Sequence, residues 1–238
     1  MNVAFVGAHQ DDEMFCLGTL LRYRKRGDRI TLICTTNGDK GISDDPAVSY
    51  EECARIRDRE MLEVARALDA DYFCVGAPDE ALYDTWEHRL KLVEFLRRSK
   101  ADVVFTHNPE DYNLDHTTTS TLTFQCAMMA QFGSIRTESP ALAAVPKIFY
   151  VDVDFGSGAV FEPTHFVELD VETVEEAVRI MGFHDSQLAV SRRLLAKDYR
   201  DSIRERLASA GERVGVRFAE GFRPCLASRR TPLARLLP

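Results

Sequence analysis

The chain has 238 residues, of which 45% are hydrophobic and 29% charged, and its net charge is −8. This length fits one sizeable α/β domain, and no apolar run approaches the roughly 18 residues that a membrane span needs. The negative charge disfavours broad binding to nucleic acid or to anionic membranes, since both need a basic surface. We therefore expect a small molecule as the main partner, and a homo-oligomer stays open.

The first residues have the pattern of a buried strand, not that of an export signal. Met1 and Asn2 lead straight into an apolar run, without a basic segment and a long apolar stretch before it, so we expect a cytoplasmic protein. The six cysteines are scattered and form no C-x-x-C pair, and Cys34 and Cys74 lie in apolar, strand-like runs. They are expected to be free buried thiols and not disulfides or zinc ligands.

Strand-like and helix-like segments alternate along the chain. The first strand is expected at residues 3–8, and an amphipathic helix at 18–26 follows it. The pattern then predicts strands at 29–36, 72–76, 103–106 and 147–152, and helices at 51–68, 87–98, about 115–129 and, as one long helix, 172–196. This alternation predicts one α/β domain, residues 1–227, with a mostly parallel sheet covered by helices on both faces. Residues 228–238 are expected to form a flexible tail.

Imidazole and carboxylate side chains follow the predicted strand ends, where α/β folds bind their ligands. His9 and Asp12 follow the first strand, and His116 follows the fourth. Three nitrogen and oxygen ligands with an open fourth position form the arrangement of catalytic zinc, whereas a structural site is closed by four protein ligands. Fe²⁺, Mn²⁺ and Co²⁺ accept the same donors. The competing interpretation is helix capping, by Asp11 or Asp12 for one helix and by Asp115 for another.

Spacing assigns different roles to neighbouring acids. If the chain turns helical near His9, positions 9 and 12 share one face and Asp11 points elsewhere. Asp11 is then free to act as general base, because zinc lowers the pKa of a water that it binds to about 7 and a carboxylate can take the proton during attack. Glu13 would support the ligands or begin the following helix.

The segment Ala8-His9-Gln10-Asp11-Asp12-Glu13 resembles the Ala-His-Pro-Asp-Asp-Glu signature of the PIG-L/LmbE-type deacetylases, which remove acetyl groups from N-acetylglucosamine-containing substrates. Weaker similarities follow in the family's order: Thr36-Asn37-Gly38, Arg57-Asp58-Arg59-Glu60, Asn113-Leu114-Asp115-His116, His184-Asp185-Ser186-Gln187 and Ala219-Glu220-Gly221-Phe222-Arg223. The resemblance implies a Rossmann-like fold that binds one zinc ion through His9, Asp12 and His116, with Asp11 as general base.

The resemblance also implies residues for substrate binding. Arg57 would contact the part of the substrate beyond the sugar, against the alternative of a solvated or capping arginine on a charged helix. Asn37 and Asp79, which follow the second and third strands, are further candidates for substrate binding. Gln10 stands where the family has proline, which should change the stiffness of the loop more than its chemistry.

Asn113 is the serious departure from the family pattern. Many members carry a histidine there that stabilises the oxyanion and protonates the leaving amine. Asparagine can donate a hydrogen bond but cannot deliver a proton, and loss of one oxyanion donor costs about 10²–10³ in rate. We expect His184 or His107 to supply the imidazole, with Asp11 returning the proton to the amine.

Other activities fit the sequence less well. Asp152-Val153-Asp154 resembles the Asp-x-Asp of haloacid-dehalogenase-type phosphatases, but it does not follow the first strand. A nicotinamide enzyme is disfavoured because no G-x-G-x-x-G turn follows that strand. Two alternatives remain open: a thiol-conjugate amidase of the same fold and a catalytically impaired metal-binding protein. The loops at 41–49, 81–86 and 133–146 are expected to shape the pocket and so to determine which N-acetylated sugar or glycoconjugate binds.

Overall fold

The structure is a computed structural model that describes residues 1–42, 46–151 and 161–227. The tail expected at 228–238 and the Asp152-Val153-Asp154 segment therefore lie outside the described residues. Over the described ranges, no helix is both long and apolar enough to cross a membrane.

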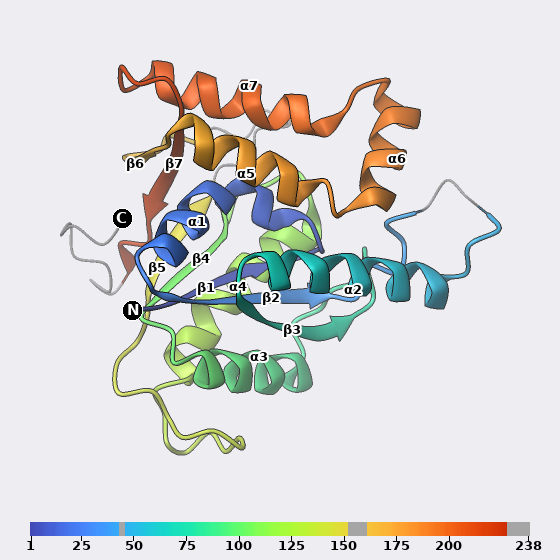
Figure 1. The fold of residues 1–238 in the computed structure, drawn as a ribbon. Coiled ribbons are helices and arrows are strands. Elements are labelled where there is room, and N and C mark those ends of the chain that lie inside the picture. Colours follow the sequence, from blue (N-terminus) through green and yellow to red (C-terminus); the bar gives the residue numbers. More distant parts are fainter. Residues whose placement is uncertain (43–45, 152–160, 228–238) are drawn as a thin grey trace.

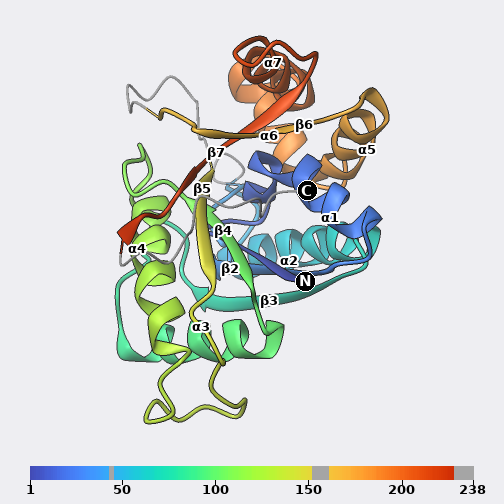
Figure 2. The same ribbon diagram turned by 90° about the vertical axis from the view of Figure 1, so that its left-hand side faces the viewer.

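A seven-stranded sheet forms the centre of the molecule, in the order β3-β2-β1-β4-β5-β7-β6 (Figures 1 and 2). Its strands are β1 (Asn2–Gly7), β2 (Arg29–Thr36), β3 (Ala70–Ala77), β4 (Val103–His107), β5 (Lys147–Val151), β6 (His165–Glu168) and β7 (Ala219–Pro224). The first five are parallel, whereas β7 runs antiparallel to both β5 and β6. The prediction of a mostly parallel α/β sheet is confirmed.

Helices cover both faces of this sheet, as expected. They are a 3₁₀ helix η1 (Asp12–Phe15), α1 (Leu17–Lys25), α2 (Tyr50–Ala67), α3 (Trp86–Ser99), α4 (Leu114–Met129), α5 (Val171–Met181), α6 (Asp185–Leu195) and α7 (Tyr199–Glu212). One apolar core lies between the sheet and α1, α2 and α5, with α7 packed further out, and a second core lies between the sheet and α3 and α4. Figure 1 shows α3 on the side of the sheet opposite to α1 and α5.

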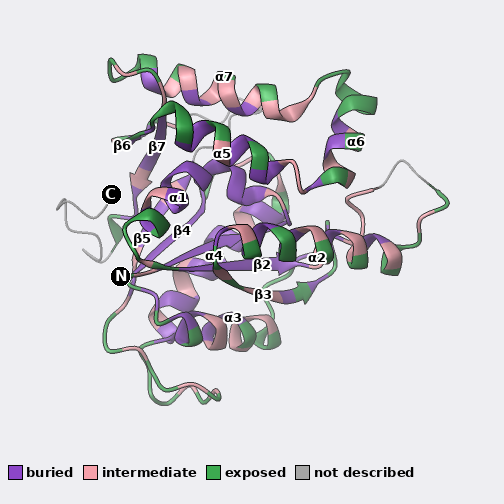
Figure 3. Cartoon of the chain, viewed as in Figure 1, coloured by how far each residue is buried: buried purple, intermediate pink, exposed green. Residues whose placement is uncertain are grey.

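The period-2 alternation of a strand explains why residues 3–6 of β1 are all apolar. Val3 and Phe5 belong to the first core, and the intervening Ala4 and Val6 belong to the second. Because both faces are covered, every position must be apolar, and Figure 3 shows the central strands as buried. All six cysteines are free, and five of them are buried.

The prediction of one long helix at 172–196 is wrong. The segment forms α5 and α6, which are separated at residues 182–184. The carbonyl of Met181 accepts a hydrogen bond from the Tyr199 hydroxyl, and His184 leaves helical geometry with φ −79° and ψ 63° to place its side chain in the interior. A side chain from another helix therefore satisfies a carbonyl at the end of α5, where the helical ladder stops.

The C-terminal strand β7 is linked directly to the first helix. The carboxylate of Glu220 accepts hydrogen bonds from the backbone N–H groups of Gly18, at 2.9 Å, and Thr19, at 2.7 Å. These are N–H groups of the first turn of α1, which have no partner within the helix. Neither β6, α7 nor β7 was predicted from the sequence, although the motif around Glu220 was identified there.

Candidate active site

A cavity of about 470 Å³ opens at the carboxyl edge of the sheet. Its lining comes from the turn after β1, the loops after β2 and β3, the start of α4, and single residues of α2 and α6. The lining residues are His9, Asp11, Asp12, Met14, Phe15, Lys40, Gly41, Arg57, Asp79, Glu80, Tyr112, Asn113, His116 and Gln187. The cavity thus lies where parallel α/β folds bind their ligands.

The turn between β1 and η1 is held in an unusual backbone conformation. Asp11 has φ 139°, in a region that side-chain-bearing residues rarely adopt, at a cost of about 1–3 kcal/mol. The backbone N–H of His9 donates to Asp12 Oδ2 at 2.7 Å, and the side-chain amide of Gln10 donates to the carbonyl of Thr36 at 3.2 Å. These contacts fix the turn so that His9, Asp11 and Asp12 all face the cavity.

The three expected metal ligands come together in this turn and at the start of α4. His116 Nε2 lies 3.3 Å from His9 Nδ1 and 3.4 Å from Asp12 Oδ1, and His9 Nδ1 lies 3.6 Å from Asp12 Oδ2. For a tetrahedral ion with bonds of 2.0–2.1 Å, neighbouring ligand atoms are about 3.3 Å apart. The donor types and their separations therefore fit a zinc-like ion.

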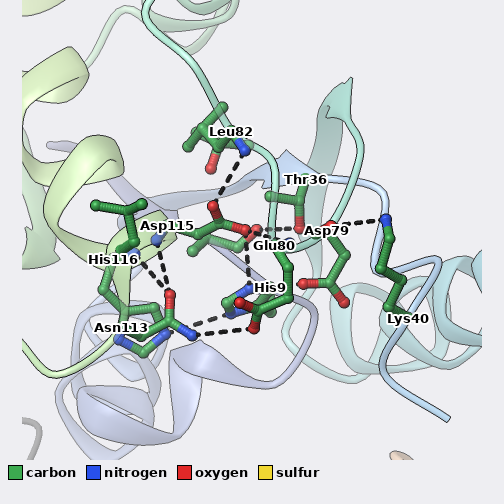
Figure 4. Close-up of polar contacts among 12 residues, drawn as sticks. His9, Thr36, Lys40, Asp79, Glu80, Leu82, Asn113, Asp115 and His116 are labelled. Carbon is green, nitrogen blue, oxygen red and sulfur yellow. Dashed lines mark hydrogen bonds and ion pairs between the residues drawn. The ribbon is translucent and has the colours of Figure 1, made fainter. Parts of the chain in front are cut away.

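Carboxylates lie behind both imidazoles, on the side away from the metal position. His9 Nε2 lies 3.0 Å from Asp79 Oδ1 and 3.5 Å from Asp115 Oδ2 (Figure 4). His116 Nδ1 lies 3.1 Å from Asp111 Oδ1. Such partners fix the tautomer and the orientation of a metal-binding histidine. Asp79, a candidate for substrate binding, therefore contacts the His9 ring on the side away from the metal position. It also lines the cavity.

Asp115 connects the ligands to the loop that follows β3. Its carboxylate accepts hydrogen bonds from the backbone N–H groups of Glu80, at 2.7 Å, and Leu82, at 3.1 Å, while it faces His9 (Figure 4). The loop at 81–86, expected to influence specificity, is thus attached through the Asp115 side chain to His9, one of the candidate metal ligands.

The charges of this group favour a cation. Burial opposes protonation of His9, but the carboxylates of Asp115, Asp12 and Asp79 raise its pKa well above the ordinary value. Burial likewise opposes protonation of His116, yet Asp12 and Asp111 raise its pKa to about 9. The carboxylates therefore attract positive charge to this position, which either protons or a metal ion can supply.

His107 contacts two of the candidate metal ligands, His116 and Asp12. Its ring stacks on that of His116, with centroids 3.9 Å apart, and its Nε2 lies 2.9 Å from Asp12 Oδ2. Burial, together with the neighbouring His116, lowers the pKa of His107. His107 is fully buried and is not among the residues that line the cavity.

Arg57 reaches the turn from α2. Its Nη2 donates to Asp11 Oδ1 at 2.9 Å and also to the backbone carbonyl of Gln10. Burial raises the pKa of Asp11, and the guanidinium opposes this rise. Gly41 covers Arg57 so closely that a Cβ atom there would overlap the guanidinium. Arg57 is therefore held in place, and because it is buried the alternative of a solvated arginine does not apply.

Asn113 caps α4. Its Oδ1 accepts from the backbone N–H groups of Asp115, at 2.7 Å, and His116, at 3.3 Å. Its side-chain amide lines the cavity and donates to Glu80 Oε1 at 3.4 Å. Asn113 thus orients the helix that carries His116 and leaves an N–H donor at the cavity.

Two more of the candidate residues, besides His107, lie away from the cavity. His184 is fully buried, and its Nε2 contacts Glu13 Oε1 at 2.7 Å. Asn37 lines a separate cavity together with Gln10 and Cys74, and its Oδ1 accepts from the backbone N–H of Asp39 at 3.1 Å.

The cavity also contains side chains that were not chosen from the sequence. Lys40 donates to Asp39 Oδ1 at 2.8 Å and to the carbonyl of Asp79 at 2.7 Å. Lys40 lies shortly after the end of β2, where residues of this fold bind ligands, so its place in the sequence could have identified it. Gln187 belongs to the His184-Asp185-Ser186-Gln187 motif, so the resemblance gave a signal for it. Tyr112 gave none, because its place at the cavity depends on how the loop before α4 folds.

Comparisons with known proteins agree with this site. The family model described as PIG-L, GlcNAc-PI de-N-acetylase, matches residues 4–127, slightly more than half of the chain. A Bacillus anthracis protein named probable N-acetyl-alpha-D-glucosaminyl L-malate deacetylase 2 is 26% identical over 217 residues, covering 86% of this chain and 89% of that protein.

Two solved structures have the same fold. The N,N'-diacetylchitobiose deacetylase of Pyrococcus horikoshii has a TM-score of 0.79 and 23% identity, covering 94% of this chain and 83% of that one. GalB of Pseudomonas putida KT2440, named a 4-carboxy-2-hydroxymuconate hydratase, has a TM-score of 0.79 and 19% identity, covering 98% and 100%. The fold alone therefore accommodates more than one reaction. The family match, which includes the turn after β1 and the start of α4, is the stronger finding, and the chain belongs to the PIG-L family of de-N-acetylases.

Proposed function

We propose that the protein is a metal-dependent deacetylase that hydrolyses the N-acetyl group of an amino sugar, with zinc as its metal. The observation that carries this proposal is the separation of 3.3–3.6 Å among His9 Nδ1, His116 Nε2 and the Asp12 carboxylate, beside the carboxylate of Asp11 and at the wall of an open cavity. His9, Asp12 and His116 would hold the ion. When bound, it would supply Lewis acidity to the acyl carbonyl and acidify water.

Three side chains would carry out proton abstraction, positioning of the base and stabilisation of the oxyanion. The Asp11 carboxylate takes a proton from the attacking water as its oxygen bonds to the acetyl carbon. Arg57 holds that carboxylate in place through the contact at 2.9 Å. Asn113 offers its amide N–H to the oxygen that becomes negative, after release from Glu80.

Collapse of the tetrahedral adduct breaks the C–N bond and needs a proton on the leaving nitrogen. Asp11 is the group at the cavity that has just received one, and we assign this transfer to it. His184 and His107 are both buried outside the lining, so their proposed contribution is to hold Glu13 and Asp12, respectively. The products are acetate and the free amine.

Amino sugars are the proposed substrates because two similar proteins are named for them. The Bacillus anthracis relative is named for an N-acetylglucosaminyl malate, and the Pyrococcus horikoshii structure for diacetylchitobiose. A cavity of about 470 Å³ lies within the range of about 300–1,000 Å³ usual for small-molecule sites.

Metal analysis combined with an amine-release assay tests the proposal. The protein, loaded in turn with Zn²⁺, Fe²⁺, Mn²⁺ or Co²⁺, is incubated with a panel of N-acetyl sugars and with an N-acylated thiol conjugate. We expect zinc-dependent release of amine from at least one sugar. His116→Ala should lose the metal, whereas Asp11→Asn should keep the metal and lose activity. Amine release from the thiol conjugate alone would replace the sugar with that substrate class, and no release from any compound would refute the proposal.

A further inference from the structure

A second cavity adjoins the metal-binding one. It has a volume of about 440 Å³ and lies among η1, α6, α7 and β7. Met14 and Phe15 of η1 line both cavities. The backbone carbonyl of Met14 accepts a hydrogen bond at 2.6 Å from Arg206 of α7, whose guanidinium also lies over the Phe15 ring. Arg206, which lines the second cavity, therefore holds in place the two residues that the cavities share, Met14 and Phe15.

Helix α6 runs along both cavities. Gln187 lines the metal-binding cavity, and Ser191 and Leu195 line the second. These residues are spaced by four and share one face of the helix. At 1.5 Å per residue, the second cavity begins about 6 Å along the helix from Gln187 and continues to about 12 Å. The second cavity therefore lies within reach of a group attached to a sugar whose acetyl group occupies the metal position.

The surface of the second cavity is suited to an apolar group. Phe15, Leu195 and Tyr199 contribute apolar side chains to its lining, and Leu195 is 71% exposed. Lys197 is paired with Glu205 at 2.6 Å, and Arg213 is paired with Glu162 at 2.8 Å. The third cation of the lining, Arg206, donates to the backbone carbonyl of Met14. A large exposed leucine beside charges that already have partners offers apolar area to a ligand.

We propose that the second cavity binds the aglycone, the group attached to the amino sugar, and that this group is apolar. The inference rests on the proposed deacetylase function and extends it from the sugar to the rest of the substrate. Substrates of this kind are aryl or alkyl glycosides of N-acetylglucosamine. Binding of the aglycone would place the acetyl group beside Asp11 and would lower KM without requiring a change in kcat.

Kinetics on two related substrates test the inference. For the zinc-loaded protein, kcat/KM is measured for N-acetylglucosamine and for its phenyl glycosides of both anomeric configurations. Burial of a phenyl ring should raise kcat/KM for one glycoside at least about tenfold, chiefly through KM. Ser209→Trp, which places an indole in the second cavity from the exposed side of α7, should reduce the ratio of the two kcat/KM values to near one. Glu212→Trp, on the same helix but outside the lining, should leave that ratio unchanged.

Binding measurements separate this inference from the proposed function. Calorimetry on Asp11→Asn should show that the phenyl glycoside binds at least about tenfold more tightly than the free sugar, and that adding Ser209→Trp removes the difference. Equal affinities for the two ligands, or an unchanged difference in the double variant, would refute the aglycone site even if the free sugar is deacetylated. Tighter binding of the glycoside without amine release from any substrate would support the second cavity and refute the deacetylase assignment.

Discussion

Arg57 Nη2 lies 2.9 Å from Asp11 Oδ1 and also donates to the backbone carbonyl of Gln10. One guanidinium group from α2 therefore holds both the side chain of the proposed base and the backbone that precedes it. Asp11 itself has φ 139°, so these contacts stabilise a conformation that the isolated chain would rarely adopt. The proposed base is positioned by a contact across 46 residues of sequence.

The planar fork of this arginine should be necessary for catalysis. Arg57→Lys retains one positive charge but cannot reproduce both contacts, so Asp11 should lose its fixed position. We expect kcat to fall about 10²-fold, the effect of a displacement of about 1 Å, with little change in metal content. Arg59→Lys, at an exposed position of the same helix, is the matched control. An Arg57→Lys variant with wild-type kcat would show that Arg57 does not position Asp11.

The carboxylate behind His9 should control the affinity for metal. Asp115→Asn keeps the shape of the side chain but replaces one acceptor oxygen with an NH₂ group. The remaining oxygen cannot accept from all three partners of the Asp115 carboxylate, which are the N–H groups of Glu80 and Leu82 and the His9 ring. Loss of such a partner typically weakens metal binding about 10–100-fold. Competition with a chelator measures the dissociation constant, and Glu110→Gln, on an exposed part of the preceding loop, serves as control. An unchanged constant would mean that His9 is oriented without Asp115.

His184 and Glu13 form a buried pair that should act by positioning. His184→Ala leaves the Glu13 carboxylate buried without its partner, and the free energy of unfolding should fall by about 3–5 kcal/mol. His184→Gln can still donate to Glu13 and should restore much of the stability and of kcat. Urea unfolding and steady-state kinetics measure both effects.

The pH profile distinguishes positioning from proton donation. A positioning role for His184 lowers kcat without shifting either limb of the profile, whereas loss of a catalytic acid removes the limb at high pH. The same change at His107, which contacts Asp12 at 2.9 Å, should instead reduce metal content. Loss of the high-pH limb in His184→Gln would identify His184 as the proton donor after all.

Asp198 should give a pH-dependent contribution to stability. Hydrogen bonds from Arg200, against a smaller effect of burial and with help from Arg192, hold the pKa of Asp198 well below its usual value. A depressed carboxyl pKa stabilises the fold above the unfolded-state pKa of about 3.9, and this contribution is lost as the pH falls through the folded-state pKa. Asp198→Asn should therefore reduce the free energy of unfolding by about 0.5–1 kcal/mol at pH 7. The difference from wild type should shrink below pH 4, and a difference that grows on acidification would contradict the assignment.

The sequence was sufficient for the parts of the fold that depend on local patterns. Strands such as β1 are apolar on both faces, which requires a covered sheet and so predicts its parallel arrangement. His9, Asp12 and His116 were identified because strand ends in parallel sheets converge on one edge. The structure brings these three side chains together as expected.

Features that depend on distant contacts could not be predicted in this way. The break between α5 and α6 depends on Tyr199 reaching Met181 and on His184 entering the interior, neither of which changes the helical periodicity. Asn37 was chosen for its place after a strand, yet β2 carries it to a different cavity. A strand end predicts the edge of the sheet, whereas the packing of loops decides which side chains face the cavity.

The contact between Glu220 and the first turn of α1 has a consequence for the order in which the chain is synthesised. Gly18 and its acceptor are 202 residues apart, so the ribosome produces the turn with His9 and Asp12 long before the strand that supports the helix after it. Until β7 has been synthesised, the N–H groups at the start of α1 lack the Glu220 carboxylate as their acceptor. The helix that follows His9 and Asp12 acquires this support when β7 joins the sheet, and we expect tight metal loading to require β7.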